Sequence, residues 1–224
     1  WILDPLCFML IYVFMFGYVF KSKQQYFAIF VFIGITLWDF FNKCLIQSVK
    51  VIKANKPIVS KVYIPKFILI LVKMGVNGFK MFISLLIIVA MLIVWRVPVT
   101  YNVIYIIPIL MTLVVLVFGC CCFLLHYGVF VEDLSNVLNI ALRFLFYLTG
   151  IFWSIMDRLP SPYNYYIGRC NPIAFLLTSA RDCVIYGSTP HRKLLLLWFV
   201  IGLIISALGV RKIYKNENSY VKVI

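Results

Sequence analysis

The chain has 224 residues, of which 64% are hydrophobic and only 12% are charged, and its mean hydropathy is +1.04. A water-soluble domain has about a quarter of its residues charged, so this composition excludes a soluble globular protein and indicates one embedded in lipid. The formal net charge of +14 favours contact with anionic lipid headgroups. We expect no nucleic-acid partner, because there is no soluble basic surface to bind one.

Six apolar segments follow one another along the chain, separated by short breaks that contain turn residues. A helix needs about 20 mostly apolar residues to cross roughly 30 Å of hydrocarbon. We therefore predict an all-α integral membrane protein that forms a single domain over residues 1–224. Its six transmembrane helices are predicted at residues 1–20, 27–47, 67–95, 103–126, 137–156 and 194–210.

The first span begins at Trp1, with neither an initiator methionine nor the basic segment of a signal peptide. We therefore expect this chain to lack the start of the natural protein. In the second span, Asp39 and Lys43 are four residues apart and share one helix face. We expect them to neutralise each other rather than to form a proton relay.

The break at residues 49–66 carries five lysines and no acid, and the tail after the last span is also basic. Cytoplasmic loops of membrane proteins are enriched in Lys and Arg. We therefore predict that this break and both termini lie in the cytoplasm.

The third span carries a polar stripe. Lys66, Lys73, Asn77, Lys80 and Ser84 are spaced so that an α-helix brings them within about 60° of one another. Cations along roughly 21 Å of helix are costly against lipid. Two interpretations stay open: the helix start lies at the interface with its lysines extended to water, or Lys66, Lys73, Asn77 and Lys80 bind a substrate phosphate.

The segment between the fifth and sixth spans contains another apolar stretch, too short to cross. Asn171 followed by Pro172 is typical of a helix N-cap and first helical residue, and Gly187 ends the stretch. We predict that residues 172–186 form a reentrant helix in the outer leaflet, with a second short dip before it. Such segments are tolerated where they are buried in protein or line a cavity, which favours a gate on the outer side.

Aromatic residues make up 17% of the chain, more than interfacial belts need. Core packing is one explanation for the rings inside the spans, and stacking against sugar faces in a conduit is the other. On the second reading, the conduit and gate are formed by Tyr147, Phe152, Trp153, Asn171, Pro172 and Phe175.

No enzyme signature is present, because the chain contains no phosphate-binding loop, no H-E-x-x-H and no G-x-S-x-G motif. His126 and His191 fall at opposite predicted membrane faces, and only seven acids are present. We predict that the chain is not an enzyme, holds no metal and binds no cofactor.

Five short motifs occur in order along the chain. They are WILDP at residues 1–5, GITLWDFF at 34–41, NKPIVSKVYIPK at 55–66, VFVEDL at 129–134, and Asn171-Pro172. In this order on six spans, the chain resembles the membrane subunit of bacterial polysaccharide ABC exporters, of the ABC-2 type, which move O-antigen, capsule and teichoic acid chains. It departs from the family in lacking an initial amphipathic interfacial helix and in having Lys66 where Arg is often found.

The resemblance implies a half-transporter that exports a lipid-linked polysaccharide across the bacterial cytoplasmic membrane. It further implies a homodimer bound to two copies of a separate ATPase subunit, which would hold ATP and Mg²⁺. The coupling contacts with the ATPase would then be made by Asn55, Lys56, Ile58, Val59, Lys61, Tyr63, Pro65, Lys66, Phe130, Glu132 and Asp133. An ABC-2 permease for drugs or small lipids is the alternative. A membrane-embedded glycan-processing enzyme would need an acidic cluster that the sequence lacks.

Overall fold

The computed structural model describes Cys7, Leu10, Ile11, Phe14 and residues 26–59, 61–154, 160 and 163–223. In these residues the regular structure is entirely helical, as predicted. The elements are α2 (Phe27–Ala54), α3 (Lys56–Val59), α4 (Lys66–Val94), the 3-10 helix η2 (Tyr101–Tyr105), α5 (Ile106–Phe130), α6 (Leu134–Leu148), α8 (Tyr163–Cys170), α9 (Pro172–Val184) and α10 (Arg192–Val223).

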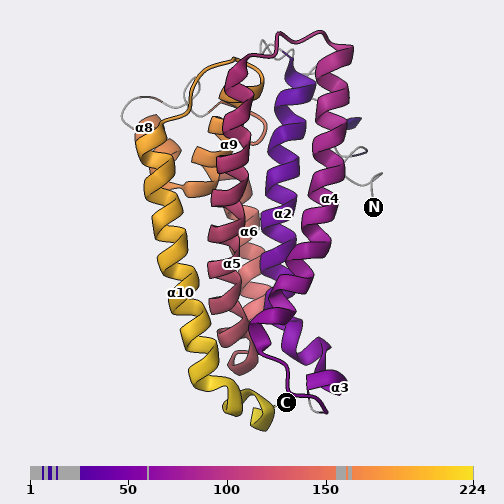
Figure 1. Cartoon of the computed structure of the whole chain (residues 1–224), viewed down its shortest axis with the longest axis vertical. Helices are drawn as coiled ribbons and strands as arrows, with labels where there is room; N and C mark the ends of the chain where they lie inside the picture. Colours follow the sequence, from indigo (N-terminus) through magenta and orange to yellow (C-terminus); the bar gives the residue numbers. More distant parts are fainter. Residues whose placement is uncertain are drawn as a thin grey trace.

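Four segments of the described chain are long and apolar enough to cross a membrane: Phe27–Ala54, Lys66–Val94, Tyr101–Phe130 and Arg192–Lys215. They correspond to the second, third, fourth and sixth predicted spans. Figure 1 shows them side by side along the long axis of the molecule, with α3 and the C-terminus at one end and α8 at the other. We call these two ends the α3 end and the α8 end. The first predicted span lies almost wholly outside the described residues.

The fifth predicted span is shorter in the structure than the continuous helix expected over residues 137–156. Helix α6 has 15 residues and ends at Leu148, which gives a length of about 22 Å. Gly150 then adopts a φ of +66°, a conformation that suits glycine and commonly terminates a helix. The apolar composition continues past this point, which is why the sequence pattern missed the helix end.

Two helices extend beyond their predicted ends at the α3 end. Helix α2 continues to Ala54, through part of the break predicted at residues 49–66. Helix α10 continues through the basic tail to Val223. The polar ends of both helices therefore extend the bundle beyond its apolar part. Asn55, the first of the predicted coupling residues, directly follows the end of α2.

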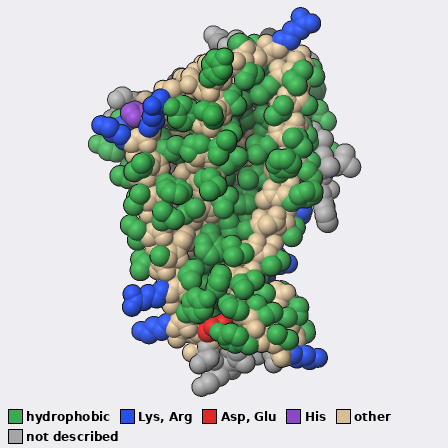
Figure 2. Space-filling model, in the orientation of Figure 1, with side chains coloured by type: hydrophobic (Ala, Val, Ile, Leu, Met, Phe, Trp, Pro, Cys, Tyr) green, Lys and Arg blue, Asp and Glu red, His purple; other side chains and the backbone are tan. Residues whose placement is uncertain are grey.

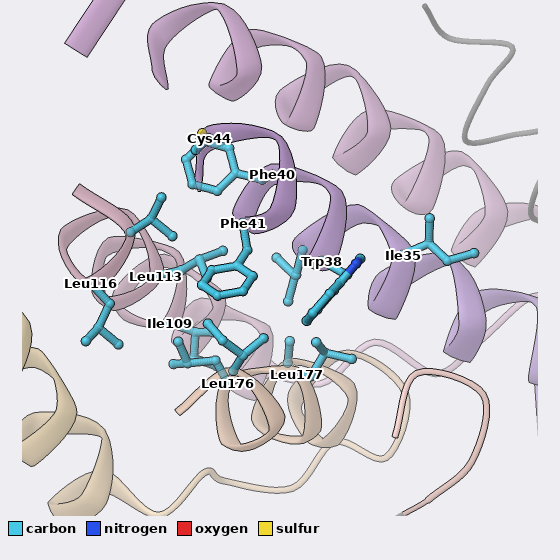
Figure 3. Close-up of a cluster of buried hydrophobic side chains, with 14 of the residues drawn as sticks. Ile35, Trp38, Phe40, Phe41, Cys44, Ile109, Leu113, Leu116, Leu176 and Leu177 are labelled. Carbon is cyan, nitrogen blue, oxygen red and sulfur yellow. The ribbon is translucent and has the colours of Figure 1, made fainter. Parts of the chain in front are cut away.

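Helix α2 is the centre of the bundle, and it contacts α4, α5, α6 and α9. In its most apolar stretch 78% of the residues are buried, against 17% for α10. Figure 3 shows Phe41 of α2 beside Leu113 of α5 and Leu176 of α9, and Trp38 of α2 beside Leu177 of α9. The rings of Trp38 and Phe41 are 5.4 Å apart, within the range favourable for aromatic pairs.

Helices α5 and α10 approach each other closely through glycine. A Cβ atom on Gly119 would lie 2.9 Å from the backbone nitrogen of Ser206, and one on Gly209 would lie 2.6 Å from Cβ of Cys122. Ser206 Oγ also donates to the carbonyl of Val115 at 2.9 Å. Small residues that let helix backbones approach are characteristic of membrane helix pairs.

Helix α9 lies inside the bundle toward the α8 end, as Figure 1 shows. Its predicted N-cap is confirmed, since Asn171 Oδ1 accepts from the backbone nitrogens of Ile173 at 3.1 Å and Ala174 at 3.3 Å, and Pro172 begins the helix. Gly187, three residues past the helix, accepts from Asn102 through its carbonyl at 2.5 Å. Asn171 and Pro172 line a cavity together with Phe41 of α2 and Leu116 of α5, near the middle of both helices. Helix α9 therefore runs from the middle of the bundle back to η2 at the α8 end.

Candidate functional site

The predicted coupling segment forms a short polar projection at the α3 end. Asn55 ends α2 by donating from Nδ2 to the carbonyl of Val51 at 2.7 Å. Helix α3 follows, with Val59 buried and Ile58 50% exposed. Lys56 and Lys61 are also exposed. An exposed apolar side chain flanked by lysines is suited to docking on a partner surface.

The far end of this segment is fixed to α10 by Glu217. Tyr63 donates from its hydroxyl to Glu217 Oε2 at 3.1 Å. Lys66 Nζ lies 3.9 Å from Glu217 Oε1 and donates to the carbonyl of Ile64 at 3.0 Å. The hydrogen bond to Glu217, and then the negative charge of this carboxylate, raise the pKa of Tyr63 above its usual value. Pro65 is the N-cap of α4.

Sequence reasoning missed Glu217, although its position carries a signal. It is a single acid in a tail that otherwise carries Arg211, Lys212, Lys215 and Lys222. In the structure it is 8% exposed. A buried carboxylate needs a partner, and the two partners here come from the coupling segment and the start of α4.

The second predicted coupling contact lies at the same end of the molecule. Phe130 is exposed at the end of α5, and Glu132 and Asp133 are exposed in the turn before α6. A Cβ atom on Gly128 would collide with the backbone carbonyl of Val49, so the end of α5 just before this turn lies against the last part of α2. The structure therefore brings both predicted coupling segments to the α3 end.

The lysine stripe of the third span is divided between different environments. Lys66 and Asn77 are buried, while Lys73 is exposed and Lys80 is half-buried. Asn77 donates to Gln47 Oε1 of α2 at 3.0 Å, and Ser84 donates to the carbonyl of Lys80 at 3.2 Å. Part of the polar face of α4 thus contacts α2 and α10. Phosphate binding by Lys66, Lys73, Asn77 and Lys80 stays a prediction.

The expectation for Asp39 and Lys43 of α2 is confirmed. Lys43 Nζ donates to Asp39 Oδ2 at 2.7 Å, and the two side chains are 39% and 33% exposed. In this single chain the ion pair therefore lies on a partly exposed part of α2.

The predicted conduit and gate residues differ in exposure, although the rings of Tyr147 and Phe152 both contact Phe146. Tyr147 is 68% exposed and Phe175 is 6% exposed. Trp153 is half-buried, and the ring of Phe152 contacts Phe146 at 5.4 Å. Their contact with sugar stays a prediction, and for Phe175 the position in the core fits the packing interpretation.

Asn171 and Pro172 do line an open space. A cavity of about 540 Å³ lies between α2, α5, α6, α8 and α9, and Phe41 and Leu116, near the middle of α2 and α5, are among its lining residues. Its walls are almost entirely apolar and include Cys120, Tyr166 and Cys170. The volume is within the range of about 300–1,000 Å³ that is typical of small-molecule sites.

Arg181 is a structurally important residue that sequence reasoning did not single out. It lies on α9, is 3% exposed, and donates to three carbonyls: Nε to Phe30 at 3.0 Å, Nη1 to Gly150 at 2.8 Å and Nη2 to Ile151 at 2.6 Å. Its guanidinium also lies 3.6 Å from the ring centroid of Phe30. The only signal in the sequence is an arginine in a short apolar helix.

No family model matches the chain. Two O-antigen export system permease proteins RfbA from Klebsiella pneumoniae are similar to it. Each is 23% identical, one over 222 residues that cover 99% of this chain, the other over 224 residues that cover all of it. In both cases the match covers 85% of the relative. The chain is a distant homologue of the O-antigen export permeases. The family resemblance predicted from the motifs is thereby confirmed.

This permease homologue is a transport component rather than an enzyme, as predicted, because the full-length similarity is to permease proteins. Together with the four long apolar helices, the homology supports an integral membrane protein. In the described residues, no group of three or more His, Cys, Asp or Glu side chains could hold a metal ion.

Proposed function

We propose that this chain is the permease half of an ATP-driven exporter that moves a lipid-linked polysaccharide across the bacterial cytoplasmic membrane. The observation that carries this proposal is the similarity to O-antigen export permeases over 99% of the chain. Candidate cargoes are glycans of the O-antigen, capsule or teichoic acid type. The chain supplies the path and the gate, and ATP hydrolysis with Mg²⁺ occurs in a partner subunit.

Six crossings with both termini in the cytoplasm are part of the proposal. The four long helices account for four crossings. Helix α6 and the residues after it connect the α3 end to the α8 end and supply the fifth, while residues 1–20 supply the first. The basic residues at the α3 end support a cytoplasmic position for that end. Helices α8 and α9 then enter from the outer side and return to it, as a reentrant gate would.

The ATPase is proposed to bind the α3 end. The support is the projection formed by α3, with exposed Ile58 and Lys61, at the same end of the molecule as the exposed turn that holds Glu132 and Asp133. The contact of Glu217 with Tyr63 and Lys66 links this surface mechanically to α10 and α4. Two copies of the chain, each bound to one ATPase subunit, would form the complete exporter.

Deletion of the gene from the bacterium that carries it tests the proposed cargo. We expect surface glycan to be lost and lipid-linked glycan to accumulate in the membrane fraction, with both effects reversed by the wild-type gene. Surface staining and extraction of the lipid-linked glycan measure the two quantities. Unchanged surface glycan together with increased drug sensitivity would overturn the proposal in favour of a drug-exporting permease.

Site-specific cross-linking tests the ATPase surface. A photoreactive residue at Ile58, which is 50% exposed at the α3 end, should form a cross-link with the ATPase subunit. The matched control is Ile104, which is 68% exposed in η2 toward the α8 end and should form none. A cross-link from Ile104 but not from Ile58 would contradict the proposed orientation.

A further inference from the structure

Basic side chains gather at the α8 end, where α8 and the start of α10 meet. Arg169 Nη2 donates to His191 Nε2 at 3.2 Å, and its guanidinium lies 3.9 Å from the ring centroid of Tyr165. Arg192 and Lys193 follow His191 and are exposed. Figure 2 shows Lys, Arg and His side chains together over this corner of the molecule. We call Arg169, His191, Arg192 and Lys193 the basic corner.

The basic corner has no anionic partner among the residues that the structure describes. The ion pairs among the described residues are Lys43 with Asp39 and Lys66 with Glu217. Neither pair includes a residue of the basic corner. Arg192 instead lies 5.0 Å from the ring centroid of Tyr105. Three permanent cations gathered at one end of a membrane bundle attract an anion from outside the chain.

Helix α8, which carries Arg169 of the basic corner, also forms part of the wall of an apolar cavity. Residues Tyr166, Ile167 and Cys170 of α8 line the cavity of about 540 Å³, and Arg169 lies between them in the same helix. Leu116 of α5 and Leu148 of α6 also line this cavity. An apolar space next to a cationic surface is complementary to an amphipathic molecule with an anionic head.

We propose that this site binds an anionic phospholipid of the bilayer, with an acyl chain in the cavity and the phosphate at the basic corner. Charge-assisted hydrogen bonds from Arg169 and Arg192 hold the phosphate, and burial of the chain adds the apolar contribution. A second copy of this chain is the poorer occupant, because a symmetric contact here would bring two basic corners together. The proposal is independent of the exported cargo, since it needs only that the protein lies in a bilayer.

Thiol labelling in nanodiscs tests the proposal with the full chain. Cys170 lines the cavity and is exposed, and Cys7 is the other exposed cysteine. In a Cys7→Ser background, a water-soluble maleimide should label Cys170 several-fold more slowly in phosphatidylglycerol discs than in phosphatidylcholine discs. Native mass spectrometry of the same protein, taken into detergent, should detect retained phosphatidylglycerol.

Charge removal separates recognition of the headgroup from general contact with lipid. Each cation near a membrane surface is worth about a fivefold change in affinity, so Arg169→Gln together with Arg192→Gln should reduce phosphatidylglycerol retention by more than about tenfold. Arg192 is exposed, and the half-buried Arg169 side chain makes its contacts with Tyr165 and His191 at the surface, so the variant should fold. The matched control is Arg211→Gln with Lys215→Gln, two exposed cations of α10 toward the other end, which should leave Cys170 protection unchanged.

Three results would each overturn the proposal. Equal labelling of Cys170 in the two lipids would show that the headgroup charge is not recognised. Full protection in the Arg169→Gln, Arg192→Gln variant would show that the basic corner does not hold the phosphate. Protection that rises with protein concentration in lipid-free detergent would identify a second copy of the chain as the occupant.

Discussion

Replacement of Arg181 by Met should destabilise the protein strongly, because this side chain joins three parts of the bundle. It extends from α9 to the carbonyl of Phe30 in α2 and to the carbonyls of Gly150 and Ile151 after α6. Met has a similar length and fills much of the same volume. The substitution therefore removes the hydrogen bonds and the charge while leaving most of the packing.

The size of the stability loss depends on whether the three carbonyls find other hydrogen-bond donors once Arg181 is replaced. The Phe30 carbonyl lies inside α2 and keeps its partner in the helix. The carbonyls of Gly150 and Ile151 lie past the end of α6 and have no helix to supply a donor. Each stranded buried carbonyl costs about 1–3 kcal/mol. Removal of a buried charge returns part of that cost, which leaves a net loss of about 3 kcal/mol.

Thermal unfolding in detergent measures the effect. For a chain of this length, 1 kcal/mol corresponds to about 2–4 °C in Tm, so Arg181→Met should lower Tm by about 6–12 °C. The control is Thr178→Ala on the same helix, whose hydroxyl donates only to the Ala174 carbonyl one turn back at 2.9 Å, and it should shift Tm by about 2 °C or less. Gly34→Ala tests the same contact independently, because its Cβ atom would collide with the Arg181 guanidinium. A Tm within about 2 °C of wild type for both Arg181→Met and Gly34→Ala would refute the reasoning.

Four further outcomes are expected. Lys61→Glu, which reverses an exposed charge at the α3 end, should reduce the amount of ATPase subunit that co-purifies severalfold without lowering membrane insertion. Equal recovery of the ATPase with the variant and with the wild type would contradict this prediction. Glu217→Gln removes the carboxylate that fixes the coupling segment to α10, so trypsin should cleave after Lys61 several times faster than in wild type, and unchanged cleavage would mean that the contact does not restrain this segment. Tyr147→Ala should slow glycan export more than it lowers the yield of folded protein, whereas equal losses would return this residue to a packing role. Lys73→Gln with Lys80→Gln should leave folded protein with basal ATPase activity in the complex but poor export, and normal export would remove the lysines from the substrate path.

Sequence by itself determined the features that depend on neighbours within a few turns of helix. Apolar runs of about 20 residues marked the four long helices because one helix must cover the whole hydrocarbon thickness. The spacing of four residues placed Asp39 beside Lys43, and the confirmed distance is 2.7 Å. Asn171 before Pro172 marked the start of α9 because an N-cap needs only its own side chain and the next three residues.

Tertiary structure decided every feature that depends on residues far apart along the chain. The stripe on α4 was visible in the sequence, but only packing determines that Lys66 contacts Glu217 and that Asn77 contacts Gln47. Periodicity shows which side chains share a helix face, and it carries no information on which helix that face meets. Arg181 follows the same rule, since its carbonyl partners lie 30, 31 and 151 residues away. A buried guanidinium takes whichever acceptors the fold brings within reach, and these are known only once the helices have packed.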